Sequence, residues 1–456
     1  MAATGVSARL RACVCADWEW QMADSPEYAT LIGQHGEGDG RLDDLSLAAF
    51  DRRERYHCEL ARELSCLDTS ELGAEEAITH RLLLDQARTF VAGARFKAHL
   101  LRVSNLEGPQ SDFPQVMKAT PTSTREERAR YISRLRAFPA QVGQIMELLR
   151  CGVNEGRVMP AVCLTDVGNQ VGCVLTEEAR DSVLFRPFVT GADEAEQRAA
   201  LSAITTAVFP AYREFSQFMA NEYLTAARQS TSCAALPDGE EMYAALLRFH
   251  TSTDMSPRQV HQAGLDEVAR ITAEMDAIQR EVGGFEGARE AFTHHLRTDP
   301  QFFVNSAAEL LELYEGRVSQ VRAQLGSLFD SVPQHPLEIS ATPPHQATSA
   351  PAAYYFAQGP ERPGLFYVNT HHLAQRPTWQ VDVLTLHEAI PGHHLQAAAA
   401  AAKQREVRLP SFRANFEDRR YGTAPSRRSM NTAYLEGWAL YSEVLREYIP
   451  NAYARL

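Results

Sequence analysis

The residues whose types and spacing could do chemistry lie close together near the C-terminal end of the chain. Five of the 15 histidines fall within 24 residues, where an even spread would place fewer than one. These are His371, His372, His387, His393 and His394. The densest part contains a His-Glu pair, then Pro-Gly, then His-His, and apolar residues precede it. Imidazoles grouped with a carboxylate in this way are typical of a metal site, above all a zinc site.

The regular zinc-peptidase spacing is absent from this segment. In a zincin helix, His-Glu-x-x-His places two imidazoles on one face, and the Glu activates the metal-bound water. Here Pro391 stands four residues after His387. On a straight helix His393 would be rotated away by about 120°, and His394 would lie about 10 Å further along the axis. Pro391 and Gly392 favour a kink or bulge. A bulge absorbing two residues would bring His393 into the ligand position, and one absorbing three would bring His394.

A third protein ligand is expected from elsewhere in the chain, because catalytic zinc usually has three protein ligands and one open position. The strongest candidate is Glu436, since a carboxylate in such apolar surroundings is costly unless it is paired or binds a metal. Glu443 lies seven residues later on the same helical face. It would either accept a hydrogen bond from a ligand imidazole or pair with a cation in solvent. Asp382 and the pair His371-His372 are weaker candidates.

The composition bounds the class of protein. The chain has 456 residues and a net charge of −13, with 45% hydrophobic and 23% charged residues. This is ample material for a core, and an acidic surface without a basic run argues against nucleic-acid binding. No apolar stretch reaches the length of a transmembrane helix. The eight cysteines form no Cys-x-x-Cys motif, and the N-terminus has no apolar signal region. We therefore expect a cytoplasmic protein that binds neither nucleic acid nor membrane.

Residues 1–330 are predicted to be mainly helical, because apolar residues recur there at three- and four-residue steps. One helix should begin after the N-cap Ser256 and stop at Gly283, and another should begin after Ser306. We expect the apolar stripes of both helices to face the core. The first stripe is Val260, Val268, Ile271, Met275, Ile278 and Val282, and the second is Leu310, Tyr314, Val318, Val321, Leu325 and Leu328.

Residues 331–456 form the predicted catalytic region, continuous with the helical part as one domain. Prolines make the connection up to Ala350 irregular. Two short strands are then predicted, Ala353–Ala357 and Leu365–Asn369, joined by a turn-rich spacer as a hairpin. In peptidases an exposed edge strand beside the active site binds extended substrate through backbone hydrogen bonds. The hairpin could equally well only cover the core.

The sequence of residues 387–396 and the segment Tyr-Leu-Glu-Gly-Trp-Ala-Leu-Tyr at 434–441 resemble the domain-of-unknown-function family 885. Segments 25–30, 248–254 and 363–369 fit the same family, so the resemblance covers nearly the whole chain. The family is mostly helical and is widely assigned to the zincin-like metallopeptidases.

The resemblance implies a large, mainly α, zincin-like fold with a small β-hairpin beside the active site. It also implies one Zn²⁺ per chain and a peptide substrate. The implied metal ligands are His387, Glu436 and one of His393 and His394, with Glu388 as general base. Tyr367 and Asn369 would lie on the substrate-side strand.

Family members continue well beyond the second motif, whereas this chain ends 20 residues after Glu436. The resemblance therefore implies a C-terminally truncated chain with reduced activity and an exposed apolar patch. The leading hypothesis is a zinc-dependent peptidase that hydrolyses short peptides. The alternatives are a truncated, catalytically silent metal-binding protein and a metal-dependent hydrolase of a non-peptide amide or ester.

Overall fold

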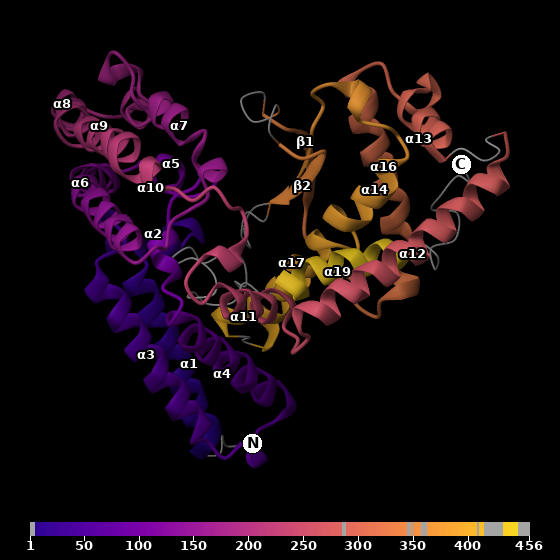
Figure 1. The fold of residues 1–456 in the computed structure, drawn as a ribbon, viewed down its shortest axis with the longest axis horizontal. Helices are drawn as coiled ribbons and strands as arrows, with labels where there is room; N and C mark the ends of the chain where they lie inside the picture. The colour runs from indigo at the N-terminus through magenta and orange to yellow at the C-terminus, as the bar shows by residue number, and fades with distance from the viewer. Residues whose placement is uncertain are drawn as a thin grey trace. The chain divides into compact units, whose positions relative to one another are not determined.

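The computed structural model describes residues 5–284, 289–343, 347, 350–356, 363–407, 410–414 and 432–445. Its described residues fall into two compact units, residues 5–250 (unit 1) and the described residues from Thr251 onward (unit 2). The division predicted near residue 330 falls inside unit 2. The described chain is mainly helical with one small sheet, which confirms the coarse fold class (Figure 1). No helix in the described part is both long and apolar enough to cross a membrane.

Unit 1 is entirely helical among its described residues. Its helices are α1 Gly5–Asp24, α2 Pro26–Leu31, α3 Leu47–Ser65, α4 Ala74–Ala94, α5 Pro109–Ala119, α6 Arg125–Asn154, α7 Val167–Val174, α8 Glu194–Ala203, α9 Phe209–Phe218, α10 Leu224–Ala226 and α11 Gly239–Thr251. The longest, α6, begins with a capping box in which the Thr124 hydroxyl accepts from the Glu127 N–H and the Glu127 carboxylate accepts from the Thr124 N–H. Buried residues of α6 and α9, among them Phe138 and Tyr212, centre the core of the unit.

Unit 2 combines helices with a three-stranded sheet. Its helices are α12 Pro257–Val282, α13 Arg289–Thr298, α14 Ala307–Leu328, α16 Gln380–Leu384, α17 His393–Val407, α18 Ser411–Ala414 and α19 Thr432–Val444. Its strands are β1 Leu337–Ala341, β2 Ala353–Phe356 and β3 Gly364–Val368. Figure 1 shows β1 and β2 beside α14, on which the sheet packs.

Helix α14 follows the sequence prediction in both its start and its buried face. The Ser306 hydroxyl caps it by accepting from the Glu309 N–H at 3.2 Å. Five of its six predicted core residues are buried, and the sixth, Leu328, packs against the same core while partly buried. The five are Leu310, Tyr314, Val318, Val321 and Leu325. The sheet and the segment that carries the His-Glu pair both pack on this helix.

Helix α12 has the predicted ends but not the predicted packing. Ser256 caps its start, and Gly283 ends it with a φ of 74° in the left-handed region. Its apolar stripe, however, is not part of a core. Val268 is 63% exposed and Ile278 49% exposed, and no residue of the helix is buried. The prediction that this stripe faces the core was therefore wrong, because the described chain places no partner element over it.

The sheet has the order β1-β3-β2, with β1 parallel and β2 antiparallel to β3. The predicted hairpin pairing is confirmed, with Tyr355 opposite Phe366. The spacer at 357–362 lies outside the described residues. Strand β1 corrects the prediction of an irregular connection, since its five residues pair with the whole of β3. One face of β3 is buried through Gly364, Phe366 and Val368, and it packs on α14.

Candidate metal centre

The segment that carries the His-Glu pair is not a straight helix. Helix α16 passes into a π-helical turn, Thr385–Ala389, and Ile390 then adopts an extended conformation with φ −130° and ψ 132°. Helix α17 restarts at His393. Gly392 lies so close to the carbonyl oxygens of Leu386 and His387 that any β-carbon would collide with them. The backbone thus makes the break that Pro391 and Gly392 predicted, and only glycine fits its tightest point.

The break places His393 next to the His-Glu pair. Ligand atoms of His387, Glu388 and His393 all lie within 4.8 Å of one another. The two imidazole rings are nearly perpendicular, with centroids 4.9 Å apart. All three residues are half-buried, so their donor atoms are sheltered without being sealed off. The local backbone therefore supplies two imidazoles and a carboxylate to one small volume.

Helix α19 adds two further carboxylates. The Glu436 carboxylate lies 3.4 Å from His387 Nε2 and 3.9 Å from His393 Nε2. Two ligand atoms at about 2.1 Å from one tetrahedral zinc are about 3.4 Å apart, so these separations suit a shared metal. Glu443 lies 2.8 Å from the other ring nitrogen of His387, Nδ1. It thereby directs Nε2 of that ring toward the space shared with Glu436 and His393.

Glu388 has an environment different from that of Glu436. Burial raises the pKa of Glu388 to about 7, although the nearby His387 and a backbone hydrogen bond oppose the shift. That bond comes from the Tyr355 N–H, which donates to Glu388 Oε2 at 3.0 Å. Burial also lowers the pKa of His393, and the neighbouring His387 adds to the shift. These shifts favour a neutral imidazole, the form that binds a metal, beside a carboxyl group that can exchange a proton near neutral pH.

His394, the alternative to His393, points elsewhere. It is only 2% exposed, and both of its ring nitrogens lie near other polar groups. Nδ1 is 3.3 Å from the Tyr355 hydroxyl and Nε2 is 3.1 Å from the His335 carbonyl oxygen. Burial lowers the pKa of His394 to about 4. The geometry therefore favours His393 over His394 as the second imidazole of the metal group.

The weaker sequence candidates lie outside this group. Asn369 is fully buried and donates to the carbonyls of Ala347 and Ala350, so it holds a loop together. Tyr367 stacks on Tyr354 across the sheet, with ring centroids 5.0 Å apart.

Asp382 forms an ion pair with Arg317 at 2.5 Å, which occupies its carboxylate. His371 and His372 lie against each other after β3, with ring centroids 3.8 Å apart and the ring planes tilted by 59°. Among the described residues, His387, Glu388 and His393 form the one group of three whose ligand atoms all lie within 4.8 Å of one another, and neither His371 nor His372 belongs to it.

Sequence reasoning missed the residues that hold these elements in place. Tyr355 was predicted only as part of a strand, yet its main chain contacts Glu388 and its hydroxyl contacts His394. Trp438 donates its indole N–H to the Pro391 carbonyl at 2.8 Å, and Gln396 donates to the Tyr434 carbonyl. A signal for Trp438 existed, since the residue belongs to the same motif as Glu436.

The outer edge of strand β2 faces Glu388 of the metal group. The Asn369 N–H donates to the Ala352 carbonyl, and antiparallel alternation then turns the main-chain groups of Ala353 and Tyr355 away from β3. The hydrogen bond from Tyr355 to Glu388 agrees with this direction. With β3 on only one side, β2 is one of the two edge strands of the described sheet. This edge therefore holds Glu388 through the outward N–H of Tyr355.

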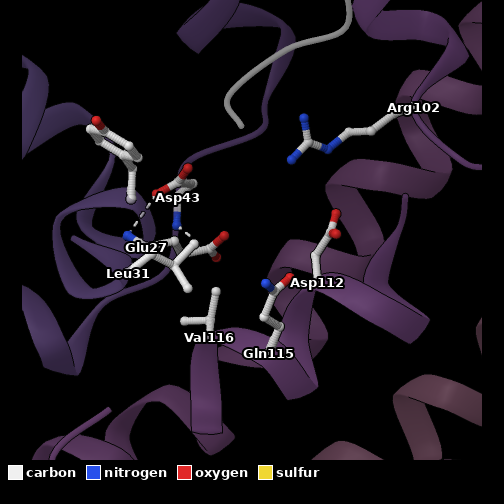
Figure 2. A pocket seen from close by; sticks show the side chains of 8 residues that line it. Glu27, Leu31, Asp43, Arg102, Asp112, Gln115 and Val116 are labelled. Carbon is white, nitrogen blue, oxygen red and sulfur yellow. Dashed lines mark hydrogen bonds between the residues drawn. The ribbon is translucent and has the colours of Figure 1, made fainter. Parts of the chain in front are cut away.

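A separate cavity lies in unit 1. It has a volume of about 20 Å³, and Figure 2 shows Glu27, Asp43, Arg102 and Asp112 directed toward it. Burial raises the pKa of Glu27 to about 8, and the adjacent Asp43 carboxylate adds to the shift. The volume suits one or two water molecules rather than an organic ligand. The chemistry of this cavity is that of a buried acidic pair, which affects stability.

The donor set suits zinc. Two imidazoles, a carboxylate 3.4 and 3.9 Å from their ring nitrogens and a second carboxylate hydrogen-bonded to one ring are the types of ligand and partner that catalytic zinc sites use. Glu388 remains beside this set as a further acid–base group. His387, His393 and Glu436 would hold the ion, and Glu443 would orient the first of them.

Comparison with known proteins places the chain in a family. The family described as "Bacterial protein of unknown function (DUF885)" matches residues 26–455, and the chain belongs to it. No curated protein matches the chain.

Two solved structures are similar in fold. One is a candidate lipoprotein from Colwellia psychrerythraea, with a TM-score of 0.85 and 22% identity over 98% of this chain and 79% of that one. The other is a candidate lipoprotein of unknown function from Shewanella oneidensis, with a TM-score of 0.65 and 17% identity over 98% of this chain and 78% of that one. At these identities the likeness concerns the fold alone.

Proposed function

We propose that this DUF885 member is a zinc-dependent peptidase that hydrolyses short peptides. The observation that carries the proposal is the position of Glu436 relative to the two imidazoles. Its carboxylate lies 3.4 Å from His387 Nε2 and 3.9 Å from His393 Nε2. A bound zinc ion would polarise the scissile carbonyl and lower the pKa of a water molecule.

The residues of the chain have separate roles in this proposal. Glu388 takes a proton from the attacking water and passes it to the leaving amine, and its pKa of about 7 suits both transfers. Glu443 holds the His387 ring through Nδ1, so that Nε2 faces the metal. The Tyr355 N–H of β2 donates to Glu388 Oε2, so this strand would hold the general base in place.

The test combines metal content with a substrate screen. Purified protein should contain about one zinc per chain by mass spectrometry, and His387→Ala should remove it. His371→Ala is the matched control, since that histidine lies outside the metal group, and its zinc content should be unchanged. Digestion of a peptide library should give cleavage by the wild type and none by His387→Ala. Zinc well below one per chain in the wild type, unaffected by His387→Ala, would contradict the proposal.

The other outcomes separate the alternatives. Full zinc occupancy without cleavage of any peptide would favour a catalytically silent metal-binding protein. Hydrolysis of small esters or amides without peptide cleavage would favour the non-peptide hydrolase. The cytoplasmic location stays a prediction, and the candidate lipoproteins of similar fold make the cell envelope the alternative that cell fractionation would test.

A further inference from the structure

Helix α19 carries Glu436, but it packs only lightly on the other described residues of unit 2. Several of its large side chains are more than half exposed, and Ala439 and Ser442 are the buried members of the helix. The exposed ones are Tyr434, Leu440, Tyr441 and Val444. Because so little of its apolar surface is buried, the hydrophobic effect contributes little to the packing of this helix. Polar contacts must therefore fix the place of the Glu436 carboxylate.

Besides the contact of Glu443 with His387 Nδ1, two side chains, Trp438 and Gln396, hydrogen-bond between α19 and the segment that follows the His-Glu pair. The Trp438 indole N–H donates to the Pro391 carbonyl at 2.8 Å, and the Gly392 carbonyl lies 3.3 Å away. The Gln396 side chain donates to the Tyr434 carbonyl at 3.0 Å. The first bond reaches the turn directly before His393, and its donor stands two residues after Glu436. It therefore links the two backbone segments that deliver the second and third ligands.

We propose that Trp438 is a positioning residue of the metal centre. Its indole N–H ties the Pro391–Gly392 turn to α19, so that His393 and Glu436 keep the separation that one ion requires. The ring is half-buried and lies near Phe329, with centroids 6.3 Å apart, which limits the directions of the N–H. Gln396 acts in the same way at the preceding turn of α19. The inference rests on the proposed zinc site and adds the element that holds it together.

The test is zinc affinity after removal of the indole N–H. Trp438→Phe keeps an aromatic ring and removes the donor. Loss of a group that orients metal ligands typically weakens metal binding by about 10- to 100-fold, and we expect a loss in this range by competition with a chelating dye. The matched control is Trp379→Phe. Its indole N–H also donates to a backbone carbonyl, that of Leu296 at 3.1 Å, without touching the metal group, so its affinity should equal that of the wild type.

A second measurement separates positioning from general destabilisation. The melting temperature of the metal-free protein should be similar in Trp438→Phe and Trp379→Phe, while only the former loses zinc affinity. Should Trp438→Phe not fold, Gln396→Leu removes another link to α19 and is expected to weaken zinc binding in the same direction.

Equal zinc affinity of Trp438→Phe and the wild type would overturn this inference and leave the proposed function standing. The inference would also be overturned if Trp438→Phe lost zinc affinity and its metal-free melting temperature fell well below that of Trp379→Phe. Failure of the wild type to bind zinc would overturn the proposed function, and the role of Trp438 with it.

Discussion

Glu388 and Glu436 are both glutamates at one site, but their surroundings assign them different tasks. Glu436 has an exposed side chain that faces two imidazoles, as a ligand would. Glu388 is half-buried, its pKa is raised to about 7, and one of its oxygens accepts from the Tyr355 N–H. A carboxyl group with a raised pKa is suited to proton transfer at neutral pH.

Replacing Glu388 should therefore separate chemistry from metal binding. We expect Glu388→Gln to keep its zinc and to lose at least about 100-fold in kcat, because an amide cannot accept the proton. Zinc content and steady-state kinetics on the best library peptide measure the two effects. Glu436→Gln should instead lower zinc affinity. Activity of Glu388→Gln close to that of the wild type would remove this residue from the mechanism.

Gly392 allows the break that brings the ligands together. A β-carbon there would collide with the carbonyl oxygens of Leu386 and His387. We expect Gly392→Ala to cost about 2 kcal/mol of stability or more, since backbone must move, and to weaken zinc binding with it. The matched control is Gly437→Ala, because nothing lies within 4 Å of a β-carbon at that position in α19. Chemical denaturation of both variants measures the difference, and equal stability would contradict this account of the turn.

The choice between His393 and His394 shows what sequence could and could not decide at this scale. The Pro-Gly pair predicted that the helix breaks, and it does. Whether His393 or His394 reaches the metal group depends on how tightly the backbone turns over the His387 carbonyl. It also depends on which of the two rings has polar partners in the protein interior. Those partners, the Tyr355 hydroxyl and the His335 carbonyl, come from distant segments. No local pattern contains them.

Helices α12 and α14 carry apolar stripes of the same period, but the two stripes have different surroundings. Val321 of α14 is 0% exposed and belongs to the core, whereas Val268 of α12 is 63% exposed. The same substitution therefore has different expected costs. Val321→Ala should lower the free energy of unfolding by about 2 kcal/mol, because it leaves a small cavity. Val268→Ala should change it by less than about 0.5 kcal/mol. Urea unfolding measures both, and equal effects would mean that α12 is covered in solution.

The same pair of helices shows why element prediction succeeded and packing prediction did not. Caps and stop signals act within a few residues, so both starts, at Ser256 and at Ser306, were predicted correctly. Burial depends on whether another element lies over the stripe, which the period of the stripe does not encode.

Strand β1 was missed for a related reason. Its five residues lie among prolines, and their strand conformation depends on pairing with β3 further along the chain. Helix caps and the hairpin partner were local enough to predict, whereas this parallel partner was not.

For the molecule as a whole, the acidic pair of unit 1 makes stability depend on pH. The pKa of Glu27 is raised from 4.5 to about 8, first by burial and then by the Asp43 carboxylate. The folded state thus holds this proton more tightly than the unfolded state. The stabilisation is complete below about pH 4.5 and is lost as the pH rises toward 8.

Glu27→Gln should remove this dependence. Relative to the wild type, the variant should gain stability steadily between pH 5 and pH 8, since glutamine carries no charge to desolvate. Urea midpoints at three pH values within this range give the slope. Glu59→Gln, at an exposed position of α3, should keep the slope of the wild type. If the urea midpoint of Glu27→Gln changed with pH as steeply as that of the wild type, other groups would be responsible for the pH dependence.

The division into two units gives the metal site a thermodynamic consequence. All of the proposed ligands belong to unit 2, and they come from segments on either side of residues 408–431. An ion that binds only the folded form adds RT ln(1 + [L]/Kd) to the stability of the unit that holds it, about 2.7 kcal/mol at a free concentration 100 times Kd. The two units should therefore respond differently to a chelator. In calorimetry, zinc should move the unfolding of unit 2 to higher temperature and leave that of unit 1 in place, so the ion would determine which half of the molecule unfolds first.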